Sequence, residues 1–321
     1  MELKFSGRYT AELRSPDGRL KQTAIADNII TDAGLNWYLT NVGPMTGYYS
    51  PLRYIGVGTG SSVPAGTDTS LQSQVGARQS WDPAISNGLS ANTSNPDAPY
   101  VEFATVFDGN AANANLTEVG TFYDPSGGVM WSRALFTTDG GSPVVINKQQ
   151  GDILTVRYRL TMSRSSQDPF TAAITDSRSN TYSVSGILTN SCLAGLLQSD
   201  RWTGNFCRSY RAGNDNTTPP SATQTSVHGS VVGSWPNDYS WTAHAAHTGP
   251  SGGFYREVSM PIATSYCNGE IKELFFYGID TLRSNIMSGL CIALKFSNAG
   301  AGMIKTSSDI LTLKVRLTFT R

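Results

Sequence analysis

The sequence predicts an all-β protein made of two tandem modules, each a β-sandwich with long loops and one short helix. Two observations carry this prediction: apolar and polar residues alternate along several segments, and the chain contains an internal repeat of about 155 residues. A composition rich in Gly, Ser, Thr and Asn, without long Lys/Glu/Ala-rich stretches, also favours strands and turns over helices. A jelly roll is one β-sandwich that such short strands can form.

The internal repeat is clearest at the end of the chain. Residues 309–321 match residues 152–164 at eight of thirteen positions, and most of the other positions hold similar residues. Shorter matches follow in the same order toward the front of each copy, at offsets between 154 and 161 residues. They pair Lys148 with Lys305, Ser132 with Ser288, Glu118 with Glu273, Tyr100 with Tyr255, Trp81 with Trp235, Gly58 with Gly213, and Ala33 with Ala194. A shared order of many matches is hard to obtain by chance and predicts a tandem duplication.

The duplication divides the chain into one module at 1–164 and a second at 165–321. The repeated segments themselves begin near residue 9 in copy one and near residue 170 in copy two. Between them, residues 165–169 are polar and end in Pro169, which is typical of a joint between domains.

Each copy ends in a segment of period two, which predicts a strand with one buried face. In copy one the expected inward residues are Leu154, Val156, Tyr158, Leu160 and Met162. In copy two they are Leu311, Leu313, Val315, Leu317 and Phe319. Mostly polar residues alternate with them, so we expect each strand to cover a core with one face.

Turn residues place the other elements of copy one. Residues 8–14 and 19–25 flank Ser15-Pro16-Asp17-Gly18, in which Pro sets φ and Gly accepts a positive φ, so these segments predict a hairpin. A short helix is expected at 31–41 after a Thr or Asp cap, with a counterpart near 190–199. Further strands are expected at 53–58, 100–107, 116–123 and 129–136.

The charge balance argues against several classes of partner. Lys and Arg number 24 and Asp and Glu number 24, so the formal net charge is zero. A neutral chain has no electrostatic attraction to nucleic acid or to an anionic membrane, and we expect neither as a partner. No stretch approaches the ~18 apolar residues of a membrane-spanning helix. The start Met-Glu-Leu-Lys-Phe is unlike a secretory signal, so we expect synthesis in the cytoplasm.

Catalytic and metal-binding patterns are incomplete. Gly56–Gly60 lacks the Lys-Ser/Thr of a phosphate-binding loop, so a tight turn is expected there. His228, His244 and His247 fall in one long polar stretch of copy two; the last two have a spacing that would suit metal ligands on a helix. No carboxylate accompanies them, and solvated histidines are expected. Copy one contains no histidine, which excludes a Ser-His-Asp set shared by both copies. We expect no catalytic residue, metal or cofactor.

Two acidic positions recur in both copies. Glu102 corresponds to Glu257, and Glu118 corresponds to Glu273. Paired carboxylates can hydrolyse glycosides, but strand-borne acids that recur beside basic residues are more simply ion-pair partners. The basic candidates are Lys148 and Lys305, and Arg159 and Arg316.

The four cysteines are Cys192, Cys207, Cys267 and Cys291, and none of them forms a Cys-x-x-Cys pair. A zinc site is therefore poorly supported. Cys291 stands in an apolar run and is expected to be a small core residue. Reduced, buried thiols are the expectation, and a Cys192–Cys207 disulfide is the alternative.

Aromatic residues in or beside the long polar stretches are the candidate contact residues. The stretches at 60–99 and 214–253 predict loops, and long loops in compact domains are typical contact surfaces. The candidates are Trp81, Trp235, Tyr239, Trp241, Tyr48 and Tyr49. They would anchor a protein partner or stack on a sugar, because Trp and Tyr are enriched at binding hot spots. For Trp81 and Trp235, which recur, packing beneath the loops is an equal alternative.

A series of short motifs runs along copy one. They are Asn28-Ile-Ile-Thr-Asp-Ala-Gly-Leu35, Tyr54-Ile-Gly-Val-Gly-Thr-Gly60, Pro64, Asp68-Thr69, Leu71, Glu118-Val-Gly-Thr-Phe122, Ser132-Arg-Ala-Leu-Phe136, Lys148 and Asp152-Ile-Leu-Thr155. This order resembles a module of tailed-bacteriophage virion proteins of the tail fibre, tail or collar appendage type. Copy two departs where Gly56–Gly60 is replaced by Arg211-Ala-Gly-Asn-Asp215, so a contact made by this loop in copy one is not carried over.

The resemblance implies a non-catalytic structural component of a bacteriophage particle, located in the virion and assembled in the host cytoplasm. Its partners would be other virion proteins and further copies of itself. Because one chain carries two similar modules, a trimer or hexamer would form a pseudo-sixfold or pseudo-twelvefold ring between tail parts of different symmetry. The alternatives are an adhesin that binds a host receptor or surface glycan, and a capsid decoration protein.

Overall fold

This computed structural model of the protein describes residues 2–40, 53–82, 84–85, 92–95, 97–164, 170–190, 193, 209–215, 217–221, 224, 227–233, 244–247, 253–277 and 292–321. Over these residues the chain is mostly β-strand, with a single helix, α1 (Asp32–Thr40), which confirms the predicted all-β class. No helix in this part of the chain is long and apolar enough to cross a membrane.

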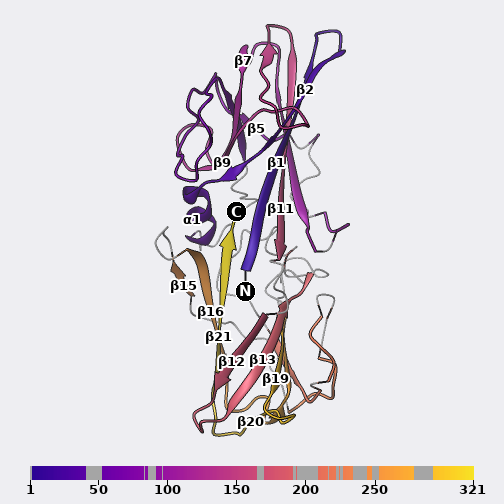
Figure 1. The fold of residues 1–321 in the computed structure, drawn as a ribbon, viewed down its shortest axis with the longest axis vertical. Helices are drawn as coiled ribbons and strands as arrows, with labels where there is room; N and C mark the ends of the chain where they lie inside the picture. The colour runs from indigo at the N-terminus through magenta and orange to yellow at the C-terminus, as the bar shows by residue number, and fades with distance from the viewer. Residues whose placement is uncertain are drawn as a thin grey trace.

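One seven-stranded sheet contains strands from both halves of the chain (Figure 1). Its order is β15-β16-β21-β1-β11-β6, with β2 also paired to β1. The bounds are β1 Glu2–Arg14, β2 Leu20–Asp27, β6 Tyr100–Phe107, β11 Ile153–Arg164, β15 His244–His247, β16 Phe254–Ile262 and β21 Leu311–Thr320. β1 joins the halves: it pairs with β11 along its length, with β21 over residues 2–4, and with β2 over residues 8–14.

Two five-stranded sheets complete the fold, one from each half. The order in the first half is β3-β9-β8-β4-β5, and in the second half it is β12-β13-β19-β18-β14. The first-half strands are β3 Ile29–Ile30, β4 Tyr54–Gly58, β5 Gln79–Ser80, β8 Glu118–Phe122 and β9 Met130–Leu135. The second-half strands are β12 Phe170–Thr175, β13 Thr181–Leu188, β14 Ser209–Gly213, β18 Glu273–Tyr277 and β19 Ile292–Ser297. Two short ladders join β7 (Ala114–Leu116) to β10 (Ile146–Lys148) and β17 (Gly269–Ile271) to β20 (Met303–Lys305).

Many strands of the two halves follow the same order along the chain and make corresponding pairs. β11 pairs with β6 as β21 pairs with β16, and Arg159 faces Glu102 in the first ladder as Arg316 faces Glu257 in the second. β8 lies between β4 and β9 as β18 lies between β14 and β19. The expected match of Ser132, at residue 288, falls outside the described residues; the strand that lies beside β18 is β19.

The first hairpins of the two halves pair differently. In the first half, β1 pairs with both β2 and β11. In the second half, the corresponding hairpin β12–β13 pairs through β13 with β19. Among the described residues, β12 forms no ladder with β21, although the first half pairs the corresponding strands. The second half thus keeps the hairpin and changes its neighbour.

The predicted alternation of buried and exposed residues holds along the last strand of the first half. All five expected inward residues of β11 are at most 4% exposed. In β21 the last three inward residues are buried, whereas Leu311 and Leu313 are half-buried.

The predicted hairpin forms, with Gly18 at φ 84°, but β1 begins six residues earlier than expected. Leu3 and Phe5 continue its period-two pattern and are buried.

Aromatic rings from both halves pack where β1 meets β21. Phe5 stacks on Phe319 with ring centroids 5.8 Å apart, and it makes edge contacts with Tyr38 at 5.1 Å and Trp131 at 5.8 Å. Pairs of this geometry add ~0.5–1.5 kcal/mol beyond their buried area. Both ends of the chain lie at this junction, in the middle of the molecule (Figure 1).

The helix predicted at 31–41 forms as α1. Thr31 caps α1, because the N–H of Gly34 donates to Thr31 Oγ1 at 2.9 Å. Of the expected counterpart helix, only residues 190 and 193 are described. The two long polar stretches are not loops throughout: β5 pairs with β4, and β15 pairs with β16. Both short strands lie along an otherwise open strand edge, where they satisfy backbone hydrogen-bonding groups.

Candidate functional site

The carboxylate of Glu118, at the start of β8, accepts four hydrogen bonds. Its residue is 0% exposed. Oε1 accepts hydrogen bonds from the backbone N–H of Gly60 at 3.0 Å and of Ser73 at 2.7 Å. Oε2 accepts from the N–H of Gln72 at 3.1 Å and from Arg133 Nε at 2.8 Å. One side chain thus holds both ends of the loop that follows β4.

Arg133, on the neighbouring strand β9, carries the contact to the middle of the same loop. Its guanidinium donates to Asp68 Oδ2 at 2.8 Å, and to the carbonyl oxygen and hydroxyl of Ser62 at 3.1 and 3.0 Å. Burial alone would lower the pKa of this guanidinium, but the hydrogen bonds to Asp68 and Glu118 outweigh it and raise the pKa. We call Glu118, Arg133, Asp68 and the loop groups they bind the Glu118 network.

The glycines of the first motif make this arrangement possible. A Cβ on Gly58 would lie 2.4 Å from the carbonyl oxygen of Ser73 and 2.5 Å from Glu118 Oε1. A Cβ on Gly60 would lie 2.4 Å from the same Oε1. Only glycine lets the backbone approach the carboxylate this closely. Gly60, Asp68, Glu118 and Arg133, which all lie in the motifs of copy one, therefore belong to one network, and Gly58 lies against it.

Glu273, at the start of β18, holds the corresponding loop of the second half. It is also 0% exposed. Its carboxylate accepts hydrogen bonds from Gln224 Nε2 at 2.5 Å and from the N–H of His228 at 2.7 Å. The His228 Nδ1 lies 3.0 Å and the Lys295 Nζ 3.2 Å from Glu273 Oε1. We call these groups, with Asp215, whose carbonyl oxygen accepts from Lys295 at 2.6 Å, the Glu273 network.

Two sequence expectations are corrected here. A solvated His228 is wrong: its side chain is 29% exposed and contacts the buried Glu273. Glu118 and Glu273 pair with Arg133 and Lys295, not with the basic residues proposed for them. Sequence reasoning misses Arg133, although it stands within the motif Ser132-Arg-Ala, because its partners Glu118, Asp68 and Ser62 lie 15, 65 and 71 residues away and only the fold brings them together.

The other recurring acids form surface ion pairs, as predicted. Glu102 contacts Arg159 at 2.8 Å, and Glu257 contacts Arg316 at 2.7 Å. Each arginine also lies over a tyrosine ring, with 4.0 Å to the centroid: Arg159 over Tyr100 and Arg316 over Tyr255. This acid–arginine–tyrosine set therefore recurs with the same geometry in both halves.

Lys148 and Lys305 bind asparagine side chains, whereas ion pairs with the recurring acids were the expectation. Each is almost fully buried, and each donates to an asparagine side chain at 2.9 Å: Lys148 to Asn113 and Lys305 to Asn268. Burial lowers the pKa of both amines. Beside each asparagine stands a residue with left-handed backbone, Ala112 at φ 53° and Cys267 at φ 52°. The two lysines thus hold corresponding turns.

The candidate aromatic residues are only partly described. Trp81 is half-buried and packs against the main core. Trp235, Tyr239, Trp241, Tyr48 and Tyr49 lie outside the described residues. The structure therefore does not bring the six candidates together into a described site, and their contact role stays a prediction.

Histidine and cysteine positions add no described metal centre. His244 and His247 lie on strand β15, so the loop expected there is wrong, and the segment is not the helix on which their spacing would suit metal ligands. Cys267 is free and buried, and burial raises the pKa of its thiol to about 11. The other three cysteines lie outside the described residues. No cluster of three or more His, Cys, Asp or Glu able to hold a metal occurs in the described part of the chain.

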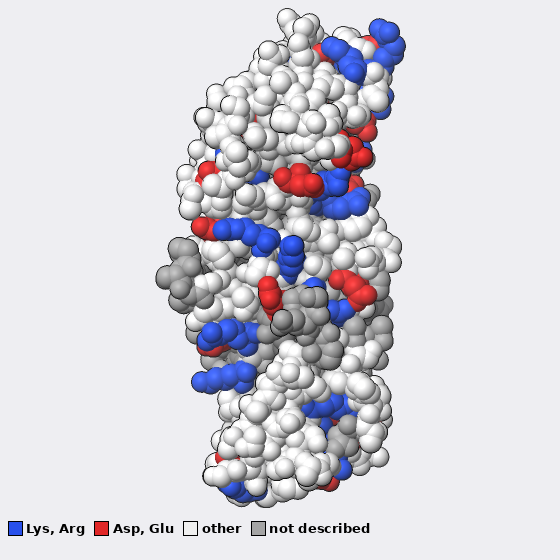
Figure 2. All heavy atoms as spheres, viewed as in Figure 1, with Lys and Arg blue, Asp and Glu red and all other residues white. Residues whose placement is uncertain are grey.

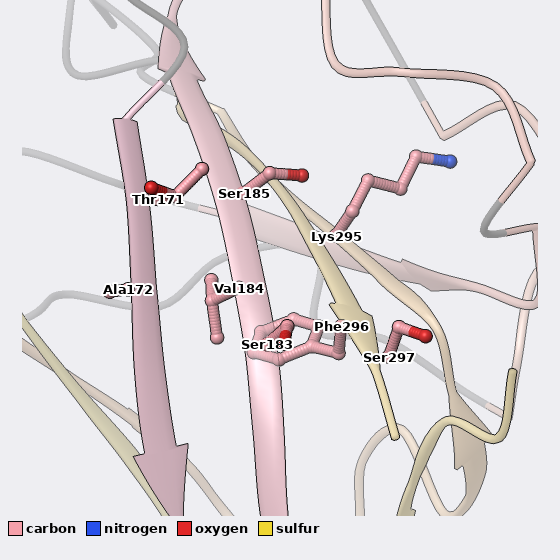
Figure 3. A pocket seen from close by; sticks show the side chains of 8 residues that line it. All are labelled: Thr171, Ala172, Ser183, Val184, Ser185, Lys295, Phe296 and Ser297. Atoms are coloured by element: carbon pink, nitrogen blue, oxygen red, sulfur yellow. The ribbon is translucent and has the colours of Figure 1, made fainter. Parts of the chain in front are cut away.

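A hollow of about 380 Å³ lies over β12, β13 and β19 (Figure 3). Its lining combines the hydroxyl side chains of Thr171, Ser183, Ser185 and Ser297 with the apolar side chains of Ala172, Val184 and Phe296. Lys295 also lines it, but its charge is engaged by Glu273 and Asp215. Such a surface offers hydrogen bonds to a neutral, polar ligand.

Comparison with known proteins adds no relative. No family model, no curated protein and no solved structure matches the chain.

Proposed function

We propose that the chain is a non-catalytic structural component of a bacteriophage particle, in its tail, collar or fibre apparatus, and that it mediates subunit assembly. In this proposal it consists of two tandem β-sandwich modules that arose by duplication. The observation that carries the proposal is the use of the recurring buried acids: Glu118 and Glu273 each fix a long loop to a sheet. Fixed loops are typical of surfaces that present contacts from a rigid scaffold.

The same observation argues for a structural rather than a catalytic role. A general acid or nucleophile needs access to a substrate. Both oxygens of Glu118 face N–H donors of the protein, and the residue is 0% exposed. Glu102 and Glu257 lie outside the buried networks and form ion pairs with Arg159 and Arg316.

Corresponding contacts in the two halves support the duplication. They comprise the Glu118 and Glu273 networks, the Glu102–Arg159–Tyr100 and Glu257–Arg316–Tyr255 sets, and the Lys148–Asn113 and Lys305–Asn268 pairs. A chain with two similar modules suits a trimer or hexamer that joins rings of different symmetry, with other virion proteins as partners. The mixed charges on the face shown in Figure 2 suit contacts made by burial rather than by long-range attraction.

The test is to purify the particles of the virus that carries this gene and to analyse their proteins by mass spectrometry. We expect the chain among them at a fixed copy number, and we expect a particle reconstruction to place both halves against other subunits. Its absence from purified particles would overturn the proposal. Hydrolysis of a bacterial surface polysaccharide that is lost in Glu118→Gln would overturn the non-catalytic role.

A carbohydrate-binding adhesin on the virion surface is the second candidate. The hollow over β12, β13 and β19 favours it, because its four hydroxyl side chains lie beside apolar ones and a sugar is recognised through several hydrogen bonds. A glycan array with the intact chain tests this candidate. Binding that is lost in Ser183→Val with Ser185→Val, and kept in Glu102→Gln, would favour the adhesin.

A further inference from the structure

Among the described residues, the outer strand of the second-half sheet, β12, has a pairing partner at one edge only. β12 pairs with β13 on one side, and no described residue pairs with its other side. Four of its six residues are exposed, and the other two are intermediate. Its sequence, Phe-Thr-Ala-Ala-Ile-Thr, contains no charged residue and no proline. Natural edge strands usually carry charged residues or proline, because an unprotected edge pairs with other chains.

Described residues cover the edges of three other strands, β6, β2 and β14. The N–H of Asp82 donates to the carbonyl oxygen of Ala104 at the outer edge of β6, at 2.8 Å. Ile25 of β2 bridges to Thr137 through two backbone hydrogen bonds of 2.7 and 2.9 Å. At β14, the N–H of Val232 donates to Ala212 at 2.9 Å. β12 lacks such a cover within the described residues.

The corresponding strand of the first half, β1, has a paired neighbour on each side. Residues 8–14 of β1 pair with β2 on one side and with β11 on the other. Its inward side chains Tyr9 and Leu13 are at most 2% exposed. The corresponding Phe170 and Ile174 of β12 are only half-buried. A strand added to the open edge of β12 would therefore restore an arrangement that the first half already has.

The hairpin register identifies the backbone groups on the open edge. The N–H of Asp176 donates to the carbonyl oxygen of Asn180 at 2.9 Å, which makes this the first hydrogen-bonded pair of the hairpin. Hydrogen-bonded and non-bonded pairs alternate along an antiparallel ladder. By this alternation, Thr171, Ala173 and Thr175 direct their N–H and C=O groups away from β13, toward the open edge.

We propose that β12 pairs antiparallel with β12 of a second copy of this chain, about a two-fold axis through Ala173. This register brings all three outward residues into hydrogen-bonded pairs: Ala173 faces itself, and Thr171 faces Thr175 of the second copy. The other face of the new ladder sets Ala172 opposite Ile174. Thr–Thr and apolar pairs are favourable across strands, and no like charges meet because the strand has none.

The contact is isologous, the commonest kind in homo-oligomers. A two-fold contact between trimers gives a closed assembly of six chains, so it is compatible with the trimer or hexamer of the proposed function. It does not depend on a role in a phage particle. A dimer in solution without any particle association would keep this inference and overturn the proposed function alone.

The test is the mass of the full chain in solution, by light scattering after gel filtration and by sedimentation velocity over a hundredfold range of concentration. Two double variants form a matched pair. Thr171→Lys with Thr175→Lys sets like charges opposite each other across the axis, and we expect monomers or assemblies of half the size. Thr171→Lys with Thr175→Glu sets opposite charges there, and we expect the wild-type mass.

A backbone variant separates this contact from loss of folding. Ala173→Pro removes an N–H that points away from β13, so the hairpin keeps its own hydrogen bonds. We expect halved mass with an unchanged circular dichroism spectrum. A wild-type chain that is monomeric at every concentration would overturn the proposal. So would an oligomer that keeps its mass in the Lys/Lys variant and in Ala173→Pro.

Discussion

Glu118 and Glu273 occupy corresponding places in the two halves of the molecule but hold their loops with different groups. Three of the four hydrogen bonds to Glu118 come from backbone N–H groups of its loop. At Glu273 the only backbone donor among the described residues is His228, and the side chains of Gln224, His228 and Lys295 supply the other contacts. The first loop is held by its backbone and the second mainly by side chains.

This difference explains why the glycine-rich motif is complete in one half only. Gly60 donates its N–H to Glu118, whereas Asp215, at the corresponding position, turns its carbonyl oxygen toward Lys295. Backbone donors need a close approach of the chain, which a Cβ prevents. Side-chain donors span the distance and leave the loop free to change. A buried carboxylate can thus keep its position while the loop sequence around it diverges.

The largest expected effect comes from removing the charge at each carboxylate. Two N–H donors face each oxygen of the Glu118 carboxylate. The amide of Glu118→Gln would therefore set its NH2 group against two N–H groups in either orientation. The variant also leaves Arg133, 2% exposed, without its buried partner. We expect a loss of about 3–5 kcal/mol in the free energy of unfolding, measured by urea denaturation.

The same change in the second half should cost less. In Glu273→Gln the new amide would keep its carbonyl oxygen toward Gln224 and Lys295 and would oppose one backbone donor, so we expect a loss of about 1–3 kcal/mol. Glu102→Gln, at a surface pair, is the matched control and should cost under ~1 kcal/mol. Equal losses in Glu118→Gln and Glu273→Gln would contradict the difference between the two networks.

The next largest effect concerns the glycine that both loops keep. Gly58→Ala places a Cβ 2.4 Å from a backbone oxygen, so the loop has to move, and we expect a loss of about 3 kcal/mol. In Gly213→Ala the nearest atoms, Glu273 Oε2 and Val227 Cβ, are 3.0 Å away and need to shift little. A loss under ~1.5 kcal/mol is expected there. Faster cleavage of residues 59–73 by a protease should accompany the first variant alone.

The sequence predicts the strands better than their neighbours. Alternation in β11 fixes which side chains are buried, because a period of two leaves only one face for the core. Pairing depends on residues far apart in sequence, and the β12–β13 hairpin shows the consequence: the repeat aligns β12 with the first strand of copy one, yet the hairpin lies beside β19 rather than β21. No local signal distinguishes these two neighbours.

The sequence predicts only part of the candidate site, for the same reason. The recurrence of Glu118 and Glu273 singles out two important acids, but their partners could not be read from spacing. Arg133 lies 15 residues from Glu118 and Lys295 lies 22 residues from Glu273, and each reaches its partner only because adjacent strands bring them together. The sequence places His228 in solvent, because a polar loop gives no indication that it folds onto a buried carboxylate.

A smaller effect is expected at Cys267, whose counterpart Ala112 cannot ionise. Burial raises the pKa of the Cys267 thiol to about 11, above its ordinary value near 9. The unfolded chain therefore loses this proton first, and the free energy of unfolding falls as pH rises from about 9 to about 11. The fall attributable to this thiol is about 2 kcal/mol.

Cys267→Ala, which installs the residue of the first half, should remove that part of the alkaline loss. Urea denaturation of the wild-type protein and of Cys267→Ala at about pH 8 and about pH 11 measures this part of the loss. The buried tyrosines and lysines contribute equally to both proteins, so their contributions cancel in the comparison. Peptide mapping after iodoacetamide treatment should find Cys267 unmodified at about pH 8 in the folded chain. An identical pH dependence in the two proteins would contradict the buried, protonated thiol.

The smallest expected effect tests whether Ala112 and Cys267 share a backbone strain as well as a position. Both have a left-handed φ, which costs a non-glycine residue about 1–2 kcal/mol. Ala112→Gly relieves that cost, but it loses about 0.8 kcal/mol of burial and roughly 0.5–1 kcal/mol through the more flexible unfolded chain. These contributions nearly cancel, so a change within about 0.5 kcal/mol is expected. Ala104→Gly, at a buried strand position without this strain, should lose about 1.5 kcal/mol in the same denaturation experiment. Equal losses at Ala112 and Ala104 would show that the left-handed turn beside Asn113 stores no strain, and the correspondence with Cys267 would then be one of position only.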